Sequence, residues 1–281
     1  MALGQMWFGT RGYMRWIKCP AVGVDASKVG WETNTQLLNG KKYVRRSVSS
    51  HKEYQLTWNL APRSELQPIM DYADGVYGTG KIYWVDPFAM DRNMFPIDWS
   101  VPSQGGYDGV ILNGGESRPE LIPTPANSNR YPAESVQYTV TSGAWVPEIW
   151  LPIPEGYTMH LGFHGVAGTG GTVTYGVTNG SSVGSFTALT PLSVSGITRT
   201  NASVSSTTGD GVIIKLGGSG TLTMTALTAV LVPTGVSVSL TGAFISGMGN
   251  AGCVFGSQPV LEQYSAALDK VGLSLNLIED I

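Results

Sequence analysis

Three short glycine-containing motifs have spacings that occur in nucleotide-binding and hydrolytic enzymes. Residues 247–252 match G-x-G-x-x-G, residues 75–81 match G-x-x-x-x-G-K, and residues 180–184 match G-x-S-x-G. Each chemistry needs a helix directly after the motif, either to meet phosphates at its N-terminus or to form a strand-to-helix elbow under the serine. The first motif precedes a segment that does not favour a helix, the second follows a predicted helix, and the third follows an Asn-Gly turn. The sequence therefore predicts loops at all three motifs.

Histidines and carboxylates offer few arrangements for metal binding or acid–base chemistry. His160 and His164 are four residues apart in a predicted strand, so they share its outward face, but no third ligand is near in sequence. Glycoside hydrolysis needs two carboxylates across a sugar subsite. The second half of the chain has Glu134, Glu148 and Glu155 near its start and almost none afterwards. We expect no catalytic residue, no metal and no cofactor.

Aromatic residues provide an alternative function, which is sugar binding without catalysis. Binding sites combine aromatic faces with a few amide or hydroxyl groups. Trp145, Trp150 and Tyr175 are the candidates for a glycan-binding face. The core of a β-sandwich would use the same residues, and this structural role is the simpler interpretation.

The first hundred residues predict several strands and one helix. Apolar residues alternate along residues 51–60, where Tyr54, Leu56, Trp58 and Leu60 fall on one face. The helix is predicted over residues 64–74. Ser64 and Gln67 have the spacing of a capping box, and Gly75 ends the helix. The remaining strands of this part are predicted at residues 10–19, 29–36, 43–49 and 81–86.

The Asn39-Gly40 pair predicts a two-residue hairpin turn, because both residues tolerate positive φ. A basic cluster, Lys41-Lys42 with Arg45-Arg46, lies beside the turn and could meet phosphates or an acidic neighbour. A solvated hairpin tip would look the same. We take the hairpin as a candidate subunit contact, formed by Asn39, Gly40, Lys41, Lys42 and Tyr43.

The second half of the chain differs in composition and predicts a β-sandwich. Prolines are frequent over residues 103–133, which we interpret as a connector. Residues 134–250 contain many short alternating segments separated by Gly, Ser, Thr and Asn, as in a jelly roll. The strands are predicted at residues 135–141, 145–153, 157–164, 171–178, 211–216, 221–232 and 236–245.

The two ends of the chain define the remaining segments. Residues 1–102 form a first domain, and residues 251–281 form a C-terminal segment in which Leu273, Leu275 and Leu277 alternate. Whether this last strand completes the first domain or the second is left open by the sequence.

Composition limits the classes of function. Charged residues make up 13% of the 281 residues, and the net charge is −3, so no global attraction to nucleic acid or membrane is expected. Up to Gly105 there are 12 Lys and Arg against 9 Asp and Glu; beyond it there are 5 against 11. Two cysteines are too few for a disulfide framework. No apolar run predicts a signal peptide or membrane helix, so we expect a soluble protein made in the cytoplasm.

The order of strands and aromatic residues resembles minor tail proteins of long-tailed (siphovirus) actinobacterial phages. The resemblance covers residues 10–102 and 250–279. It includes the strand at 13–18, the Asn39-Gly40 hairpin, the 51–65 segment, the 81–87 segment followed by Asn93 and Trp99, and the 264–275 ending. It is greatest to the distal tail class. That class implies a ring-forming β-barrel with one helix, a second galectin-like or carbohydrate-module-like domain, and a final strand that can return to the first domain.

The fold and function expected from these observations are those of a structural component. We expect an all-β protein with one short helix, built from an N-terminal β-barrel and a C-terminal β-sandwich. It would be a virion protein of the tail tip, made in the host cytoplasm. It would form a hexameric or trimeric ring and contact the tube, the tail-tip hub or fibres, with DNA only passing through the lumen. The alternatives are a host-glycan-binding module and, less favoured, a cell-wall hydrolase.

Overall fold

A computed structural model gives the architecture of the chain. It describes residues 4–20, 24–29, 32–36, 42–46, 51–85, 90, 92–103, 120–124, 132, 134–140, 148–167, 171–180, 182–189, 198–205, 210–238, 240, 247, 249–250, 252–265 and 269–280. Strands dominate this part of the chain, and it contains two helices. The prediction of an all-β protein with one short helix is therefore confirmed, apart from the additional four-residue α2 (Ile97–Ser100).

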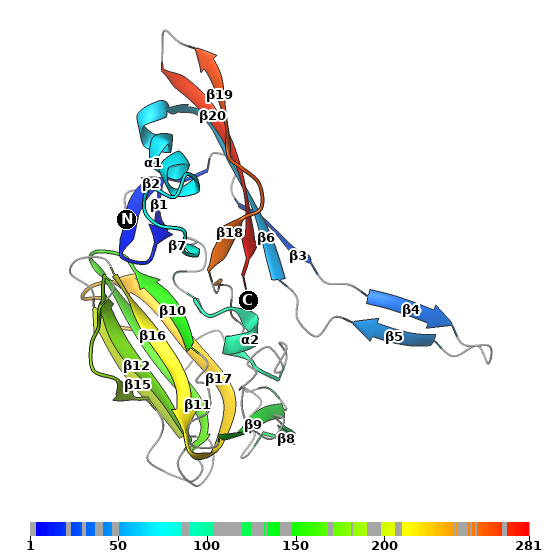
Figure 1. Ribbon diagram of the computed structural model, residues 1–281. Coiled ribbons are helices and arrows are strands. Elements are labelled where there is room, and N and C mark those ends of the chain that lie inside the picture. The colour runs from blue at the N-terminus through cyan, green and yellow to red at the C-terminus, as the bar shows by residue number, and fades with distance from the viewer. Residues whose placement is uncertain are drawn as a thin grey trace.

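One antiparallel sheet joins strands from both ends of the chain (Figure 1). Its order is β2-β1-β7-β18-β20-β6-β3, and β19 also pairs with β20. The two ends of the sequence thus build one body, which we call the first body. The sandwich is inserted in the chain between β7 and β18. The strands are β1 (Gln5–Thr10), β2 (Tyr13–Lys18), β3 (Val24–Val29), β6 (His51–Pro62), β7 (Ile82–Val85), β18 (Cys253–Phe255), β19 (Val260–Ser265) and β20 (Lys270–Glu279).

The pairing of β6 with β20 forms the centre of this body. Leu273 lies opposite Trp58, and Leu275 lies opposite Leu56, so two alternating apolar faces meet in register. The expected position of Leu60 on the same face is wrong. The register shifts between Val271 and Leu273, and Leu60 has a φ of 53° and is 60% exposed. This bulge brings Ala61 into the core in its place.

Helix α1 (Arg63–Ala73) covers one face of the sheet, where Leu66, Ile69 and Tyr72 are buried. Its N-terminus differs from the expected capping box. The N-cap is Pro62, without a side-chain hydrogen bond, and Arg63 N donates to the carbonyl of Asp269 in the β19–β20 connection. The cap is therefore supplied by the returning end of the chain, which a local motif cannot reveal.

Two five-stranded antiparallel sheets form the sandwich. One is ordered β10-β16-β12-β13, with β14 on β12, and the other β15-β11-β17-β9-β8. The strands of the first sheet are β10 (Glu148–Ile153), β12 (Gly171–Asn179), β13 (Ser182–Val183), β14 (Thr187–Ala188) and β16 (Asp210–Gly218). Those of the second are β8 (Glu120–Pro123), β9 (Glu134–Val140), β11 (Tyr157–Ala167), β15 (Thr198–Ser205) and β17 (Gly220–Pro233).

The sandwich core confirms the alternation expected for β11, because Met159, Leu161 and Phe163 are fully buried in it. The sequence did not predict eight of the strands, which are β1, β3, β8, β13, β14, β15, β18 and β19. The expected strand at 236–245 is absent over residues 236–238, and Leu240 instead packs against Val230 and Val232. Neither helix in the described part has the length and apolar character to span a bilayer.

A separate two-stranded ribbon contains β4 (Glu32–Gln36) and β5 (Lys42–Arg46). In Figure 1 it lies apart from the other sheets. Its strands pair from Glu32 with Arg46 to Gln36 with Lys42, which leaves residues 37–41 for the connection. The predicted Asn39-Gly40 turn falls in that connection, outside the described residues.

Candidate functional site

Trp150, a candidate for sugar stacking, is buried between the sandwich and the first body. It is 5% exposed, and its ring meets Tyr83 of β7 edge to face, with centroids 4.5 Å apart. Its other neighbour is Gly211, where an added Cβ would lie 2.4 Å from the indole. Trp150 therefore presents no open face to a sugar. Aromatic content alone could not distinguish an exposed platform from a contact between two parts of the chain.

Hydrogen bonds fix the Trp150 indole in this position. Its Nε1 donates to Thr178 Oγ1 at 3.0 Å, and Thr178 Oγ1 lies 2.8 Å from Asp210 Oδ1. Asp210 also accepts the amide of Gly180 in the turn after β12. That turn touches the first body, because a Cβ on Gly12 would lie 3.3 Å from Gly180 Cα. The polar groups that could have bound a sugar here instead hold the contact between the sandwich and the first body, which we call the junction.

The other candidate residues do not join Trp150 in one site. Tyr175 is half-buried and packs against the sandwich core, and Trp145 lies outside the described residues. Of the candidate contact hairpin, Asn39, Gly40 and Lys41 also lie outside the described residues. Lys42 and Tyr43 form part of β5, where their backbones pair with Gln36 and Thr35.

The glycine motif at 247–252 lies at a crossing of two chain segments. A Cβ on Gly247 would lie 1.9 Å from the Phe95 carbonyl oxygen, and one on Gly249 would lie 1.7 Å from that of Met94. Gly249 N donates to Phe95 O at 3.2 Å. These glycines permit close approach of two backbones, and no helix follows them, as expected.

The other two glycine motifs are also turns in the structure. Gly75 has a φ of 76° after α1, and Lys81 at the end of that motif forms an ion pair with Asp280 at 3.2 Å. Gly180 begins the turn between β12 and β13, and Ser182 is exposed within β13. The predicted loop is confirmed for the motif at 75–81, whereas Ser182 of the other motif lies in the two-residue strand β13.

The histidines and carboxylates are dispersed. His160 is partly exposed and its Nδ1 lies 3.0 Å from Ser203 Oγ, whereas His164 is 4% exposed, so the expectation of two outward-facing histidines is wrong for His164. Glu148 forms an ion pair with Lys215 at 2.8 Å, and Glu134 begins β9 in the opposite sheet. Among the described residues, no three His, Cys, Asp or Glu side chains are grouped for a metal ion.

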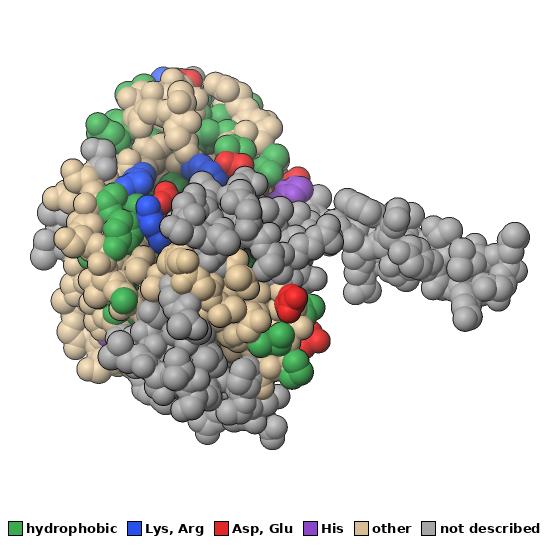
Figure 2. All heavy atoms as spheres, turned by 60° about the horizontal axis from the view of Figure 1, so that its bottom comes forward, with side chains coloured by type: hydrophobic (Ala, Val, Ile, Leu, Met, Phe, Trp, Pro, Cys, Tyr) green, Lys and Arg blue, Asp and Glu red, His purple; other side chains and the backbone are tan. Residues whose placement is uncertain are grey.

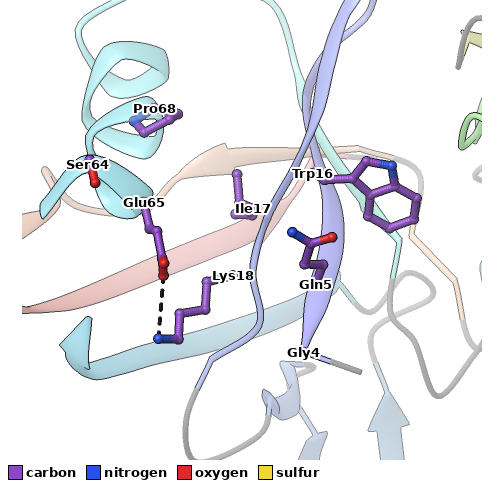
Figure 3. Close-up of a pocket in the computed structure, with 8 residues that line it drawn as sticks. All are labelled: Gly4, Gln5, Trp16, Ile17, Lys18, Ser64, Glu65 and Pro68. Atoms are coloured by element: carbon purple, nitrogen blue, oxygen red, sulfur yellow. Dashed lines mark ion pairs between the residues drawn. The ribbon is translucent and has the colours of Figure 1, made fainter. Parts of the chain in front are cut away.

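A pocket of about 340 Å³ lies between the outer strand β2 and the first turns of α1 (Figure 3). This is near the small end of ligand sites, roughly 300–1,000 Å³. Lys18 Nζ and Glu65 Oε2 form an ion pair 3.4 Å long at this pocket, and both side chains are close to half exposed. Its other lining residues are Gly4, Gln5, Trp16, Ile17, Ser64 and Pro68. The pocket offers charged and polar contacts for binding.

An arginine–tyrosine cluster lies farther along β2. The Arg15 guanidinium is 4.4 Å from the ring centroid of Tyr77 and 5.6 Å from that of Tyr72. Tyr13 is 59% exposed, and its ring centroid lies 6.0 Å from that of Tyr77. Tyrosine and arginine are enriched where proteins bind one another. Arg15 thus packs on a tyrosine of α1 and on one that follows the helix, and Tyr13 is the exposed member of the cluster.

Burial shifts the pKa values of two side chains near the junction, Tyr83 and Cys253. It raises the pKa of Tyr83 to about 12, and it raises the pKa of the Cys253 thiol to about 12. Both side chains are therefore neutral at physiological pH, and neither is an activated nucleophile or base. On the face shown in Figure 2, charged side chains occupy little of the described surface, as expected from the composition.

Sequence reasoning did not identify three residues at these sites. Tyr83 was assigned only to a strand, Arg15 was not singled out, and Asn93 was noted only as part of the resemblance. Asn93 bonds to Leu227 and Ala229 of β17. Its position between Pro87 and Pro96 was the one signal in the sequence, and it does not specify a partner.

Comparison with known proteins gives no family. No family model matches the sequence, and no curated protein matches it. Solved structures with some similarity include the enzymatically active domain of tailspike protein 4 from bacteriophage CBA120, at 13% identity and a TM-score of 0.34. That match covers 43% of this chain and 18% of the tailspike chain, so this chain spans less than a fifth of that protein.

A second similarity is to the VP2 subviral particle of infectious bursal disease virus, at 10% identity and a TM-score of 0.27. It covers 99% of this chain and 80% of that one. Both matched proteins are viral, but similarity at this level assigns neither a fold family nor an activity.

Proposed function

We propose that this chain is a structural, non-enzymatic virion protein of a phage tail tip, which forms a ring or adaptor between the tail tube and the baseplate or fibres. The observation that carries the proposal is the return of β18, β19 and β20 to the sheet begun by β1. The resemblance to distal tail proteins implied that a final strand can return in this way, so that the sandwich becomes an insertion. The architecture agrees with that arrangement.

The junction between the first body and the sandwich supports a role as a rigid adaptor. Trp7 of β1 and Val85 of β7 belong to the same buried cluster as the sandwich core. The ring centroids of Trp16 and Tyr157 are 6.2 Å apart. Aromatic packing of this kind holds the inserted sandwich in a fixed orientation. An adaptor that connects two layers of a particle needs such an orientation.

The β4–β5 ribbon supplies the proposed contact between copies. Residues 32–46 contain four Lys or Arg and one Glu, whereas the chain beyond Gly105 contains 11 Asp and Glu against 5 Lys and Arg. Opposite charges favour a head-to-tail contact between subunits, which is the geometry that closes into a ring. Hexamers and trimers are the closed forms that we propose.

Size-exclusion chromatography with light scattering tests the assembly. The full chain should give a closed species of three or six copies, visible as rings by negative-stain electron microscopy. A variant in which residues 32–46 are replaced by a short Gly-Ser linker should give single copies with an unchanged circular-dichroism spectrum. Single copies for the full chain, alone and mixed with the tube and hub proteins of the same particle, would contradict the proposal.

A further inference from the structure

One edge of β17 is completed by a segment that is not a strand. Strand β11 pairs with β17 along its whole length, from Leu222 to Pro233. On the opposite edge β9 pairs only from Gly220 to Met224. Beyond that point, residues 90–95 lie against β17. We call this segment the strap; its residue 91 is outside the described residues.

The strap is bonded to β17 partly through its backbone. Met94 N donates to Ala229 O at 2.7 Å, and Leu231 N donates to Met90 O at 2.8 Å. Met90, Met94 and the adjoining Phe95 are buried, so these bonds are shielded from water. The two contacts follow β17 in the antiparallel direction.

The Asn93 side chain takes the place of a peptide group next to the Met94 contact, over Leu227 and Ala229 of β17. Its Nδ2 donates to Leu227 O at 2.9 Å, and its Oδ1 accepts the amide of Ala229 at 3.0 Å. The same Oδ1 accepts the amide of Phe95 at 3.2 Å. Asn93 is fully buried. A side-chain amide carries a donor and an acceptor, as a peptide group does. Asn93 can therefore bond the backbone N–H and C=O groups of β17 that a neighbouring strand would otherwise bond.

The returning chain holds the strap in place from outside. Gly249 N donates to Phe95 O, and Gly247 N donates to Ser100 Oγ at 2.7 Å. Phe95 also stacks on Trp99 of α2, with planes at 9°. The strap and the helix that follows it are thus fixed between β17 and two glycines of the returning chain, Gly247 and Gly249.

We propose that the strap is a guard for the β17 edge, which prevents this edge from pairing with a strand of a second copy of the chain. An unpaired edge carries free amides and carbonyls that recruit another strand. Here the edge at Leu227, Ala229 and Leu231 belongs to a strand that is buried from Leu222 to Val232 and rich in apolar residues, which makes it prone to such pairing. Asn93 is the residue on which the guard depends.

Asn93→Ala in the full chain tests this role, with Arg92→Ala as the matched control. Arg92 is the exposed neighbour on the same strap. In Asn93→Ala the amide of Ala229 should exchange about tenfold faster or more, because it loses its acceptor Asn93 Oδ1. The amides of β16 should be unaffected. Light scattering should show concentration-dependent species larger than those of the wild-type chain, and Arg92→Ala should match the wild type in both measurements.

Unchanged exchange at Ala229 would overturn the proposal, and so would faster exchange without larger species. A second measurement applies even where Asn93→Ala does not fold. In the wild-type chain, the Met94 amide should be as protected as the β11–β17 ladder. Exchange of Met94 about tenfold faster than that ladder would show that the strap opens on its own, and would also overturn the guard. Neither result depends on whether the wild-type chain forms a ring.

Discussion

The phenol ring of Tyr83 meets the indole of Trp150 edge to face, with ring centroids 4.5 Å apart and planes at 70°. Tyr83 belongs to the sheet built from the two ends of the chain, and Trp150 belongs to the inserted sandwich. This contact explains why a residue suited to sugar stacking is buried, and it is one of several contacts that join the two bodies.

Trp150→Ala should reduce the free energy of unfolding by about 3–5 kcal/mol, the usual cost of removing a buried tryptophan. Val183→Ala, at a residue 39% exposed on β13, should change it by less than about 0.5 kcal/mol. Urea denaturation measures both. A Trp150→Ala chain of normal stability that has lost binding to a cell-wall glycan would instead restore the sugar-binding alternative.

Gly249→Ala should destabilise the chain by roughly 1–3 kcal/mol or more, because a Cβ there would lie 1.7 Å from the Met94 carbonyl oxygen. Gly80→Ala is the control, since nothing lies within 4 Å of an added Cβ at that position. Thermal unfolding compares the two variants. If Gly249→Ala were as stable as Gly80→Ala, the close crossing of the two segments would not exist in solution.

Leu275→Ala should cost about 2–5 kcal/mol, because the residue is buried opposite Leu56 at the centre of the first sheet. The exposed neighbour Ser274→Ala should be close to neutral. Because the junction packs the sandwich onto this sheet, fluorescence and circular dichroism should report one coincident unfolding transition in urea. Two separated transitions would show that the sandwich folds independently of β20.

Tyr83 should make stability decrease at high pH. Burial raises its pKa from 10.0 to about 12, so the folded chain keeps the proton over a range where the unfolded chain has lost it. This contribution is fully present below pH 10 and is lost as the pH rises toward 12; it is on the order of 2 kcal/mol. Tyr83→Phe should show a smaller loss over this range. Identical pH dependence in both chains would mean that Tyr83 ionises freely.

The sequence was sufficient where a regular alternation decides the structure. The alternating Leu273, Leu275 and Leu277 predicted a strand with one buried face, and that face is buried. Its partner strand β6 begins more than 200 residues earlier, and alternation does not specify which distant face it will meet. A single bulge then exchanged Leu60 for Ala61, because one extra residue reverses the faces of a strand.

Other features depend on tertiary contacts that have no local pattern. The N-terminus of α1 is capped by the carbonyl of Asp269, so the local Ser64 and Gln67 spacing was misleading. The Asn93 side chain bonds the backbone of Leu227 and Ala229 as a neighbouring strand would. A single side-chain amide leaves no periodic signal in the sequence. Candidate sites were harder to predict than strands for the same reason.

Cryo-electron microscopy of intact virions of the phage that we propose as the source of this chain tests the central proposal most directly. We predict density for three or six copies in a closed ring at the tail tip, with the β4–β5 ribbon at the contact between neighbouring copies. A particle that lacks the chain, or that carries it as isolated copies outside the tail, would contradict the proposal.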